Sequence, residues 1–383
     1  MARQFSNNTP WFHWQGERGE NHHFLARLLH LDGQLLLGLC LLAGVGLVVL
    51  YSAGGQDMDL VLRQLVHLIL GFSAMGLFAQ IPPQRFERIT PWVYVLGVLL
   101  LCVVLFKGDI GKGARRWLDL GVVRFQPSEI MKVAMPMTIA WLLASNPLPP
   151  RPWRLLLAAV MILLPVALIA KQPDLGTALL VSSSGIFALF LGGISWWLIG
   201  TLTTILMVFA PVAWHFLHDY QRARVMMFLN PESDPLGAGY HIIQSKIAIG
   251  SGGVYGKGLF NGTQAHLDFI PERSTDFIFA VFAEEFGLIG ECFLMTLYLS
   301  IIARGLYLAA QAQGTFARLL AGSITLTFFV YVFVNLGMVS GLLPVVGVPL
   351  PLISYGGTSL VTLMAAFGIL MSISTHRTQN GSG

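Results

Sequence analysis

Long apolar stretches recur along the whole chain, with short polar segments between them. About 20 consecutive apolar residues cross the hydrocarbon core of a bilayer as a helix. The pattern therefore predicts an all-α polytopic integral membrane protein with about ten transmembrane helices. We expect these helices at residues 34–52, 61–80, 91–106, 127–145, 153–170, 175–193, 194–217, 277–303, 318–340 and 357–375.

Composition supports this interpretation. Of the 383 residues, 55% are hydrophobic and only 11% are charged, whereas a soluble domain carries about 25% charged residues. The sequence predicts one membrane domain over residues 34–375, with polar tails at 1–33 and 376–383. The last four residues resemble an added linker, and no prediction depends on them. A net charge of +4, scattered along the chain, does not favour nucleic acid as a partner.

Basic residues in the short connections predict the orientation, because cytoplasmic loops are enriched in Lys and Arg. One set of connections carries Arg85, Arg88, Arg151, Arg154, Arg304 and Arg318. The short loops of the opposite set, 52–60 and 341–356, contain neither Lys nor Arg. An even number of spans places both ends of the chain on one side. We therefore predict that both termini are cytoplasmic.

Two outer connections, 107–126 and 218–276, are basic although they lie on the side that the rule expects to be neutral. The second is about sixty residues long and connects the seventh and eighth predicted helices. A loop of that length is unusual unless it is functional. Two interpretations stay open here: ordinary solvated loop charge, or a cationic site for an anionic ligand.

The long outer loop holds two further patterns. Residues 240–249 are too short to span and partly amphipathic, which favours an interfacial or re-entrant helix. The glycine-rich run 250–258 is either a flexible turn or a cradle whose backbone N–H groups approach an anion. It is not a P-loop, because the spacing and the Ser or Thr after Lys257 are missing.

Asp276 closes the long loop, at the outer mouth of the eighth predicted helix. Ser274, Thr275 and Asp276 are residue types that cap helix N-termini, so capping is one explanation. The other is that a carboxylate at the bilayer edge, beside basic loops, acts as a general base.

Six charged residues fall inside predicted spans, where they are expected to face the bundle interior or a water-filled cavity. Glu129 and Lys132 are three residues apart and can pair on one helix face. The six are Arg63, Glu129, Lys132, Glu284, Glu285 and Glu291.

Several strings in this sequence together resemble the SEDS family (shape, elongation, division, sporulation). One is Gln172-Pro173-Asp174-Leu175-Gly176-Thr177, and another is Pro271-Glu272-Arg273-Ser274-Thr275-Asp276-Phe277. Further matching stretches are 113–121, 125–129 and 349–357, and residues 230–241 resemble the elongation branch more than the division branch. The sequence departs from the family pattern at Ser274, where such proteins often carry His.

The resemblance implies a peptidoglycan glycosyltransferase at the outer face of the bacterial inner membrane, active in cell elongation. Its substrate would be lipid II and its leaving group undecaprenyl diphosphate. Its partners would be a class B penicillin-binding protein and other elongation-complex membrane proteins. The metal requirement is unknown, and a divalent cation such as Mg²⁺ or Mn²⁺ is one candidate for neutralising the diphosphate.

The candidate site follows from these motifs. Asp276 is the predicted general base, since the family's matching aspartate is essential. The predicted substrate-binding residues are Arg115, Arg116, Trp117, Glu129, Lys132, Gln172, Asp174, Lys246, Glu272, Arg273, Ser354 and Tyr355.

Two other classes of function stay open. A flippase or transporter for a lipid-linked precursor would also hold charges inside a helix bundle, although it calls for a charged path to both leaflets and the sequence shows no internal repeat. A non-catalytic scaffold for the penicillin-binding protein would leave the outer polar residues unexplained.

Overall fold

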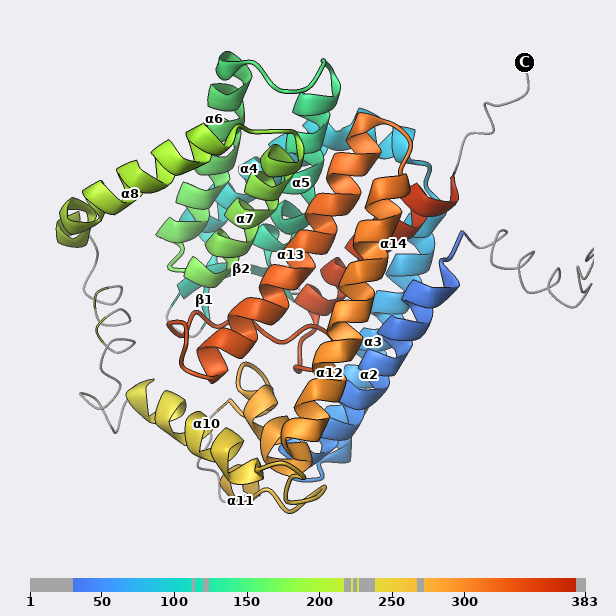
Figure 1. Cartoon of the computed structure of the whole chain (residues 1–383), viewed down its shortest axis with the longest axis vertical. Coiled ribbons are helices and arrows are strands. Elements are labelled where there is room, and N and C mark those ends of the chain that lie inside the picture. The colour runs from blue at the N-terminus through green and yellow to red at the C-terminus, as the bar shows by residue number, and fades with distance from the viewer. Residues whose placement is uncertain are drawn as a thin grey trace, which may run out of the picture.

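The fold is a helical bundle, given by a computed structural model that describes residues 30–111, 114–119, 124–216, 222, 226, 238–266 and 272–376 (Figure 1). Each of the ten predicted segments coincides with a helix. These helices are α2 (Gly33–Ala53), α3 (Met58–Ala79), α4 (Pro83–Lys107), α5 (Pro127–Ala144), α6 (Pro152–Lys171), α7 (Leu175–Leu191), α8 (Trp196–Phe216), α12 (Ile278–Gln311), α13 (Thr315–Val339) and α14 (Thr358–Thr375).

Seven of the described helices are long and apolar enough to cross a membrane. Among the ten helices at the predicted segments, the other three are α7 and α8, which contain shorter apolar stretches, and α5, which carries Glu129 and Lys132. A multi-pass helical membrane fold is therefore confirmed, while the count of ten spans stays a prediction.

Helix α13 lies at the centre of the bundle. Its most apolar window is 72% buried, against 22% for α3 and α6. It packs against α12, α7, α5 and α14, and in Figure 1 it crosses the middle of the bundle while α8 projects away to the left. A polar side chain on α13 is thus in a position to bond the elements around it.

The helix starts follow local chemistry. Asp32 accepts a hydrogen bond from Leu35 N at the start of α2, and Asp174 accepts one from Thr177 N at the start of α7. Such caps satisfy backbone donors that have no partner within the helix. Proline occupies the first turn of α4, α5 and α6, where its missing N–H costs nothing.

The connection at 107–126 contains strands that the hydrophobic pattern did not predict. Part of the 107–126 connection forms a small antiparallel sheet in the order β1 (Asp109–Gly111), β2 (Ala114–Asp119) and β3 (Arg124–Phe125). In this respect the all-α description was incomplete.

The long loop contains α10 (Ala238–Gly252) and the one-turn helix α11 (Thr263–His266), at the bottom of Figure 1. Helix α10 includes the interfacial helix predicted at 240–249, and it packs mainly on α12. The Asn230–Gly237 motif lies outside the described residues.

The two ends of the described chain meet on one side of the bundle. The rings of His30 and His376 stack with centroids 3.8 Å apart. Asp32 lies close to His30 in sequence. Its carboxylate accepts two hydrogen bonds from the guanidinium group of Arg304, at 3.1 and 2.7 Å. These contacts are consistent with an even number of spans.

Candidate functional site

Asp276 lies in a tight turn over residues 272–277 that leads into α12. Glu272 begins the turn with a left-handed backbone (φ 55°), and its carbonyl accepts from Thr275 N and Phe277 N. The N-cap of α12 is Phe277, and no side chain caps this helix. The capping explanation of Asp276 is therefore not supported.

The connection between α13 and α14 holds this turn from one side. Ser354 Oγ donates to the carbonyl of Thr275 at 2.6 Å and accepts from Leu350 N at 2.7 Å. Tyr355 N donates to the carbonyl of Ser274 at 2.8 Å. The predicted site residues Ser354 and Tyr355 thus contact the backbone directly before Asp276.

Asn335, on α13, holds the turn from the bundle interior. Its side-chain amide donates to the carbonyl of Asp276 at 2.9 Å and to that of Val348 at 2.7 Å. The residue is fully buried. It was not among the predicted site residues, because a single Asn in an apolar run gives no signal of its partners.

A second cluster joins residues from the small sheet to the start of α7. Arg116 donates to the carbonyls of Gln172 at 3.2 Å and Pro173 at 2.6 Å. One of its nitrogens lies 3.9 Å from Oδ2 of Asp174, which also accepts from Gln126 Nε2 at 3.0 Å. Arg116, Gln172 and Asp174 were each predicted to bind substrate, and the structure brings them together, while the substrate role itself stays a prediction.

The remaining members of that cluster are placed less directly. Gln172 donates its side-chain amide to the carbonyl of Leu101 at 3.2 Å. Trp117 pairs with Asp109 across β1 and β2 and is partly exposed. The side chain of Arg115 lies outside the described residues, so its predicted role has no structural test.

Glu129 and Lys132 form a buried ion pair on α5, as their spacing predicted. Lys132 Nζ lies 2.6 Å from Oε1 of Glu129 and 5.5 Å from the ring centroid of Tyr331. Tyr331 lines two small crevices, with empty volumes of about 320 and 340 Å³. Ser354 lines the first crevice and Lys132 lines the second. Tyr331 thus stands between the two groups of predicted residues.

The segment 346–348 lies close to Asp276 and also to the start of α7. A Cβ atom at Gly347 would lie 3.4 Å from Oδ2 of Asp276. A Cβ atom at Gly176 would lie 2.7 Å from the carbonyl oxygen of Val346, so α7 approaches this segment as closely as glycine permits. One short segment therefore lies close both to the Asp276 carboxylate and to the start of α7, which carries Asp174 as its N-cap.

Three further predicted residues lie in the Asp276 turn and on α10. Glu272 accepts a hydrogen bond from Thr275 Oγ1 at 2.8 Å. Arg273 Nη2 lies 3.8 Å from where a Cβ of Gly55 would be, beside the loop between α2 and α3. Lys246 is exposed on α10 and lies over Gly341 at the end of α13. The substrate roles of these three residues stay predictions.

The glycine-rich run packs against a kink in α12. Lys257 N and Gly258 N donate to the carbonyls of Glu284 and Glu285, both at 3.0 Å. The kink residue Gly287 has φ 62° and ψ −165°, which glycine adopts readily. These N–H groups are thus engaged by the protein backbone, which favours the turn interpretation over the anion cradle.

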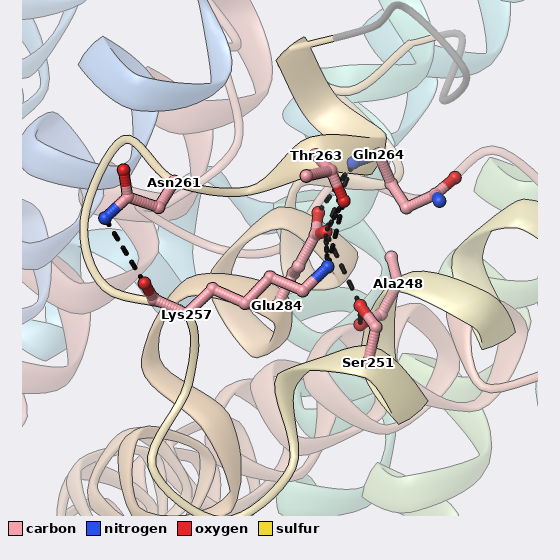
Figure 2. Close-up of polar contacts among 7 residues, drawn as sticks. All are labelled: Ala248, Ser251, Lys257, Asn261, Thr263, Gln264 and Glu284. Carbon is pink, nitrogen blue, oxygen red and sulfur yellow. Dashed lines mark hydrogen bonds and ion pairs between the residues drawn. The ribbon is translucent and has the colours of Figure 1, made fainter.

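Glu284 fixes the same segment through its side chain. It accepts from Lys257 Nζ at 2.7 Å, Thr263 Oγ1 at 3.1 Å and Gln264 N at 3.1 Å (Figure 2). Glu284 and Glu285 are almost fully buried, as predicted, and Glu291 is half-buried. Arg63, by contrast, is exposed near the N-terminal end of α3, where a long side chain can reach the interface.

Within the described residues, no group of three or more His, Cys, Asp or Glu side chains is arranged to hold a metal ion. The three cysteines are free thiols.

Comparison with known proteins shows what this chain resembles. Residues 29–379 match the family model FtsW/RodA/SpoVE, described as "Cell cycle protein". The chain is 56% identical over 350 residues to the peptidoglycan glycosyltransferase MrdB of Escherichia coli K12, covering 91% of this chain and 95% of that protein. It is 31% identical to the peptidoglycan glycosyltransferase RodA of Treponema pallidum, covering 90% and 98%.

Solved structures agree in fold. A chain from a study of how a peptidoglycan synthase complex coordinates polymerization and crosslinking superposes with a TM-score of 0.79 at 36% identity, covering 91% of this chain and 99% of that one. The Rod shape determining protein RodA of Thermus thermophilus gives 0.70 at 30% identity, covering 91% and 98%.

Proposed function

The chain belongs to the FtsW/RodA/SpoVE family of cell cycle proteins, and from this premise we propose that it is a peptidoglycan glycosyltransferase that polymerises lipid II. The observation that carries the proposal is the Asp276 turn. Three separate polar contacts, from Ser354, Tyr355 and Asn335, fix the backbone around one carboxylate. Preorganisation of that kind is what a positioned acid or base requires.

The proposed reaction joins two sugars. Asp276 takes the proton of the acceptor 4-hydroxyl while that oxygen forms a bond to C1 of the donor sugar. The bond from C1 to the diphosphate oxygen breaks, and undecaprenyl diphosphate leaves with the electron pair. A positioned base contributes about 10²–10⁴-fold to such a step.

The leaving diphosphate gathers negative charge, and basic residues of the outer segments are proposed to stabilise it. Arg115, Arg116, Lys246 and Arg273 are the candidates. Lys257 is a weaker candidate, since Glu284 already neutralises its ammonium group over 2.7 Å. A divalent cation bound with the diphosphate would supply the same stabilisation.

The membrane arrangement is part of the proposal. We infer ten spans, both termini in the cytoplasm, and a site that faces outward from the bacterial inner membrane. The meeting of His30 with His376 supports an even count. A class B penicillin-binding protein is the proposed partner, and the similarity to a chain of a peptidoglycan synthase complex supports it.

The test is formation of glycan polymer from purified lipid II by the full-length chain, alone and with its penicillin-binding protein. Wild-type protein should give polymer in the presence of penicillin, which blocks only crosslinking. Asp276→Asn should give none, while Asp59→Asn, an exposed acid at the start of α3, should match wild type.

Each proposal has an outcome that refutes it. Full polymerisation by Asp276→Asn would exclude this carboxylate as the base. Absence of polymer with wild-type protein and partner, together with movement of labelled lipid II across vesicles, would instead favour the flippase.

A further inference from the structure

A histidine from the outer helix α10 lies against the residue that follows Asp276. The rings of His241 and Phe277 are stacked, with centroids 5.6 Å apart and planes inclined by 21°. Phe277 is 3% exposed and is the N-cap residue of α12. Any shift of Phe277 therefore moves the peptide that carries Asp276.

Helix α10 presents this ring from a fixed position. One turn further along, Ser245 Oγ donates to the carbonyl of Val339 at 2.7 Å, which ties α10 to the end of α13. Ile242 and Ser245 are both almost fully buried. Because α13 also supplies Asn335, the ring and the Asp276 turn are held against the same helix.

The histidine is suited to an uncharged state. Its Nδ1 atom is buried and has no hydrogen-bond partner among the described residues. In the neutral ring this atom can be a bare acceptor, whereas protonation would bury an N–H and a charge. Burial lowers the pKa of His241, and the nearby carboxylate of Glu272 opposes that shift less strongly.

The charged and titratable groups on the elements packed against α10 come from α12, from the Asp276 turn and from α10 itself. On α12 the contact is made by Glu284, which accepts from Ser251 at the far end of α10 from His241. The turn contributes Glu272, Arg273 and Asp276, and α10 itself contributes Tyr240 and Lys246. The α13 end and the connection that follows, residues 336–354, contain no ionisable side chain. Glu272 is thus the charged group that raises the pKa of His241, against the larger effect of burial.

We propose that His241 is a positioning residue for glycosyl transfer: stacked in its uncharged form on Phe277, it holds the Asp276 turn in its reactive geometry. This inference rests on the proposed role of Asp276. It makes α10, in the long outer loop, a supporting part of the site.

The proposal has a defined pH dependence. Because its pKa is lowered in the folded protein, His241 favours the packed state above its ordinary pKa of about 6.5 and loses that contribution as pH falls below it. Acidification should therefore loosen the stack before the protein unfolds, and the rate should fall with it.

The experiment measures lipid II polymerisation by the full-length chain with its penicillin-binding protein, between pH 5.5 and 8. His241→Ala should lower kcat about tenfold with little change in KM, since misplacement of a reacting group acts mainly on the chemical step. His241→Phe restores a ring without the titration, so it should recover most of kcat and show a weaker fall below pH 6.5. Ile247→Ala, at an exposed position of α10, is the matched control.

Two outcomes would overturn the proposal: His241→Ala as active as Ile247→Ala, or His241→Phe no better than His241→Ala while both remain folded by thermal unfolding. Asp276→Asn in the same assay separates the two proposals. If it retains activity, the base assignment fails whatever His241 does. If it is inactive while His241→Ala is fully active, only the positioning role fails.

Discussion

Asn335 donates its side-chain amide to the main-chain carbonyl of Asp276 at 2.9 Å. The same nitrogen donates to Val348 at 2.7 Å, so one buried amide joins the start of α12 to the segment that passes beside the Asp276 carboxylate. A side chain of the central helix thereby fixes two irregular segments relative to each other. Buried irregular backbone needs partners of this kind, because its N–H and C=O groups have no access to water.

Replacing this amide should impair both stability and turnover. In Asn335→Ala two carbonyls lose their donor, and each buried unsatisfied group costs about 1–3 kcal/mol. We expect a lower thermal midpoint in detergent and at least a tenfold loss of lipid II polymerisation.

The control for that variant is Ser323→Ala on the same helix. Ser323 is fully buried and donates to the carbonyl of Ser184, away from the Asp276 turn. It should lose stability with nearly normal turnover in the protein that remains folded. Equal turnover losses in the two variants would mean that Asn335 acts only through general stability.

Ser354 tests the contact that holds the Asp276 turn from the connection between α13 and α14. Its hydroxyl donates to Thr275 and accepts from Leu350, so Ser354→Ala leaves a buried carbonyl and a buried N–H without this partner. We expect a several-fold fall in kcat with a smaller effect on KM. Ser372→Ala removes a buried hydroxyl that donates to the carbonyl of Ile81, far along α14 from the site, and should leave kcat unchanged. A matching fall in both variants would contradict a local role.

Much of the fold could be predicted because hydrophobic length determines where helices can lie in a membrane. All ten predicted segments became helices. The pair of Glu129 with Lys132 was also predictable, since a spacing of three places both on one face of a helix. Local spacing was enough in each of these cases.

The contacts that build the site were not accessible in this way. Asn335 and Asp276 are 59 residues apart, and Ser354 and Thr275 are 79 apart. A single sequence does not reveal which distant segments pair. The sequence likewise left two interpretations of the glycine-rich run open. The structure favours the turn, because Lys257 N and Gly258 N donate to the carbonyls of Glu284 and Glu285.

The ion pair of Glu284 and Lys257 should control the order of the glycine-rich segment. Glu284→Gln removes the charge that attracts Lys257 Nζ at 2.7 Å and weakens the bonds from Thr263 and Gln264. We expect faster hydrogen exchange over residues 250–264. Combined with Lys257→Met in a double-mutant cycle, the pair should show a coupling of about 0.5–3 kcal/mol. Additive effects would show that the pair contributes no energy of its own.

The stacked rings of His30 and His376 should make the joined termini sensitive to acid. Burial, and then the neighbouring His376, lower the pKa of His30. The contact is therefore favoured above the ordinary pKa of about 6.5 and weakens as pH falls below it. Between pH 7.5 and 5.5 the thermal midpoint of wild type should fall more than that of His30→Gln. His215→Gln, at an exposed position of α8, should follow wild type.

Arg116 tests whether the second cluster needs a guanidinium group or only a positive charge. Its planar fork reaches the carbonyls of Gln172 and Pro173 together, with Asp174 beside it. A lysine keeps the charge but cannot reproduce that fork. Arg116→Lys should therefore lose nearly as much polymerisation as Arg116→Ala, about tenfold.

The matched control is Arg154→Lys, at the start of α6, where the guanidinium lies over the ring of Trp153 at 5.1 Å. It should polymerise lipid II like wild type. Recovery of activity by Arg116→Lys would show that charge alone suffices, and that Arg116 acts on the anionic substrate rather than by holding the Gln172–Asp174 turn. If both Arg116 variants lose polymerisation and hydrogen exchange rises at residues 172–177, Arg116 acts by holding the turn that precedes α7.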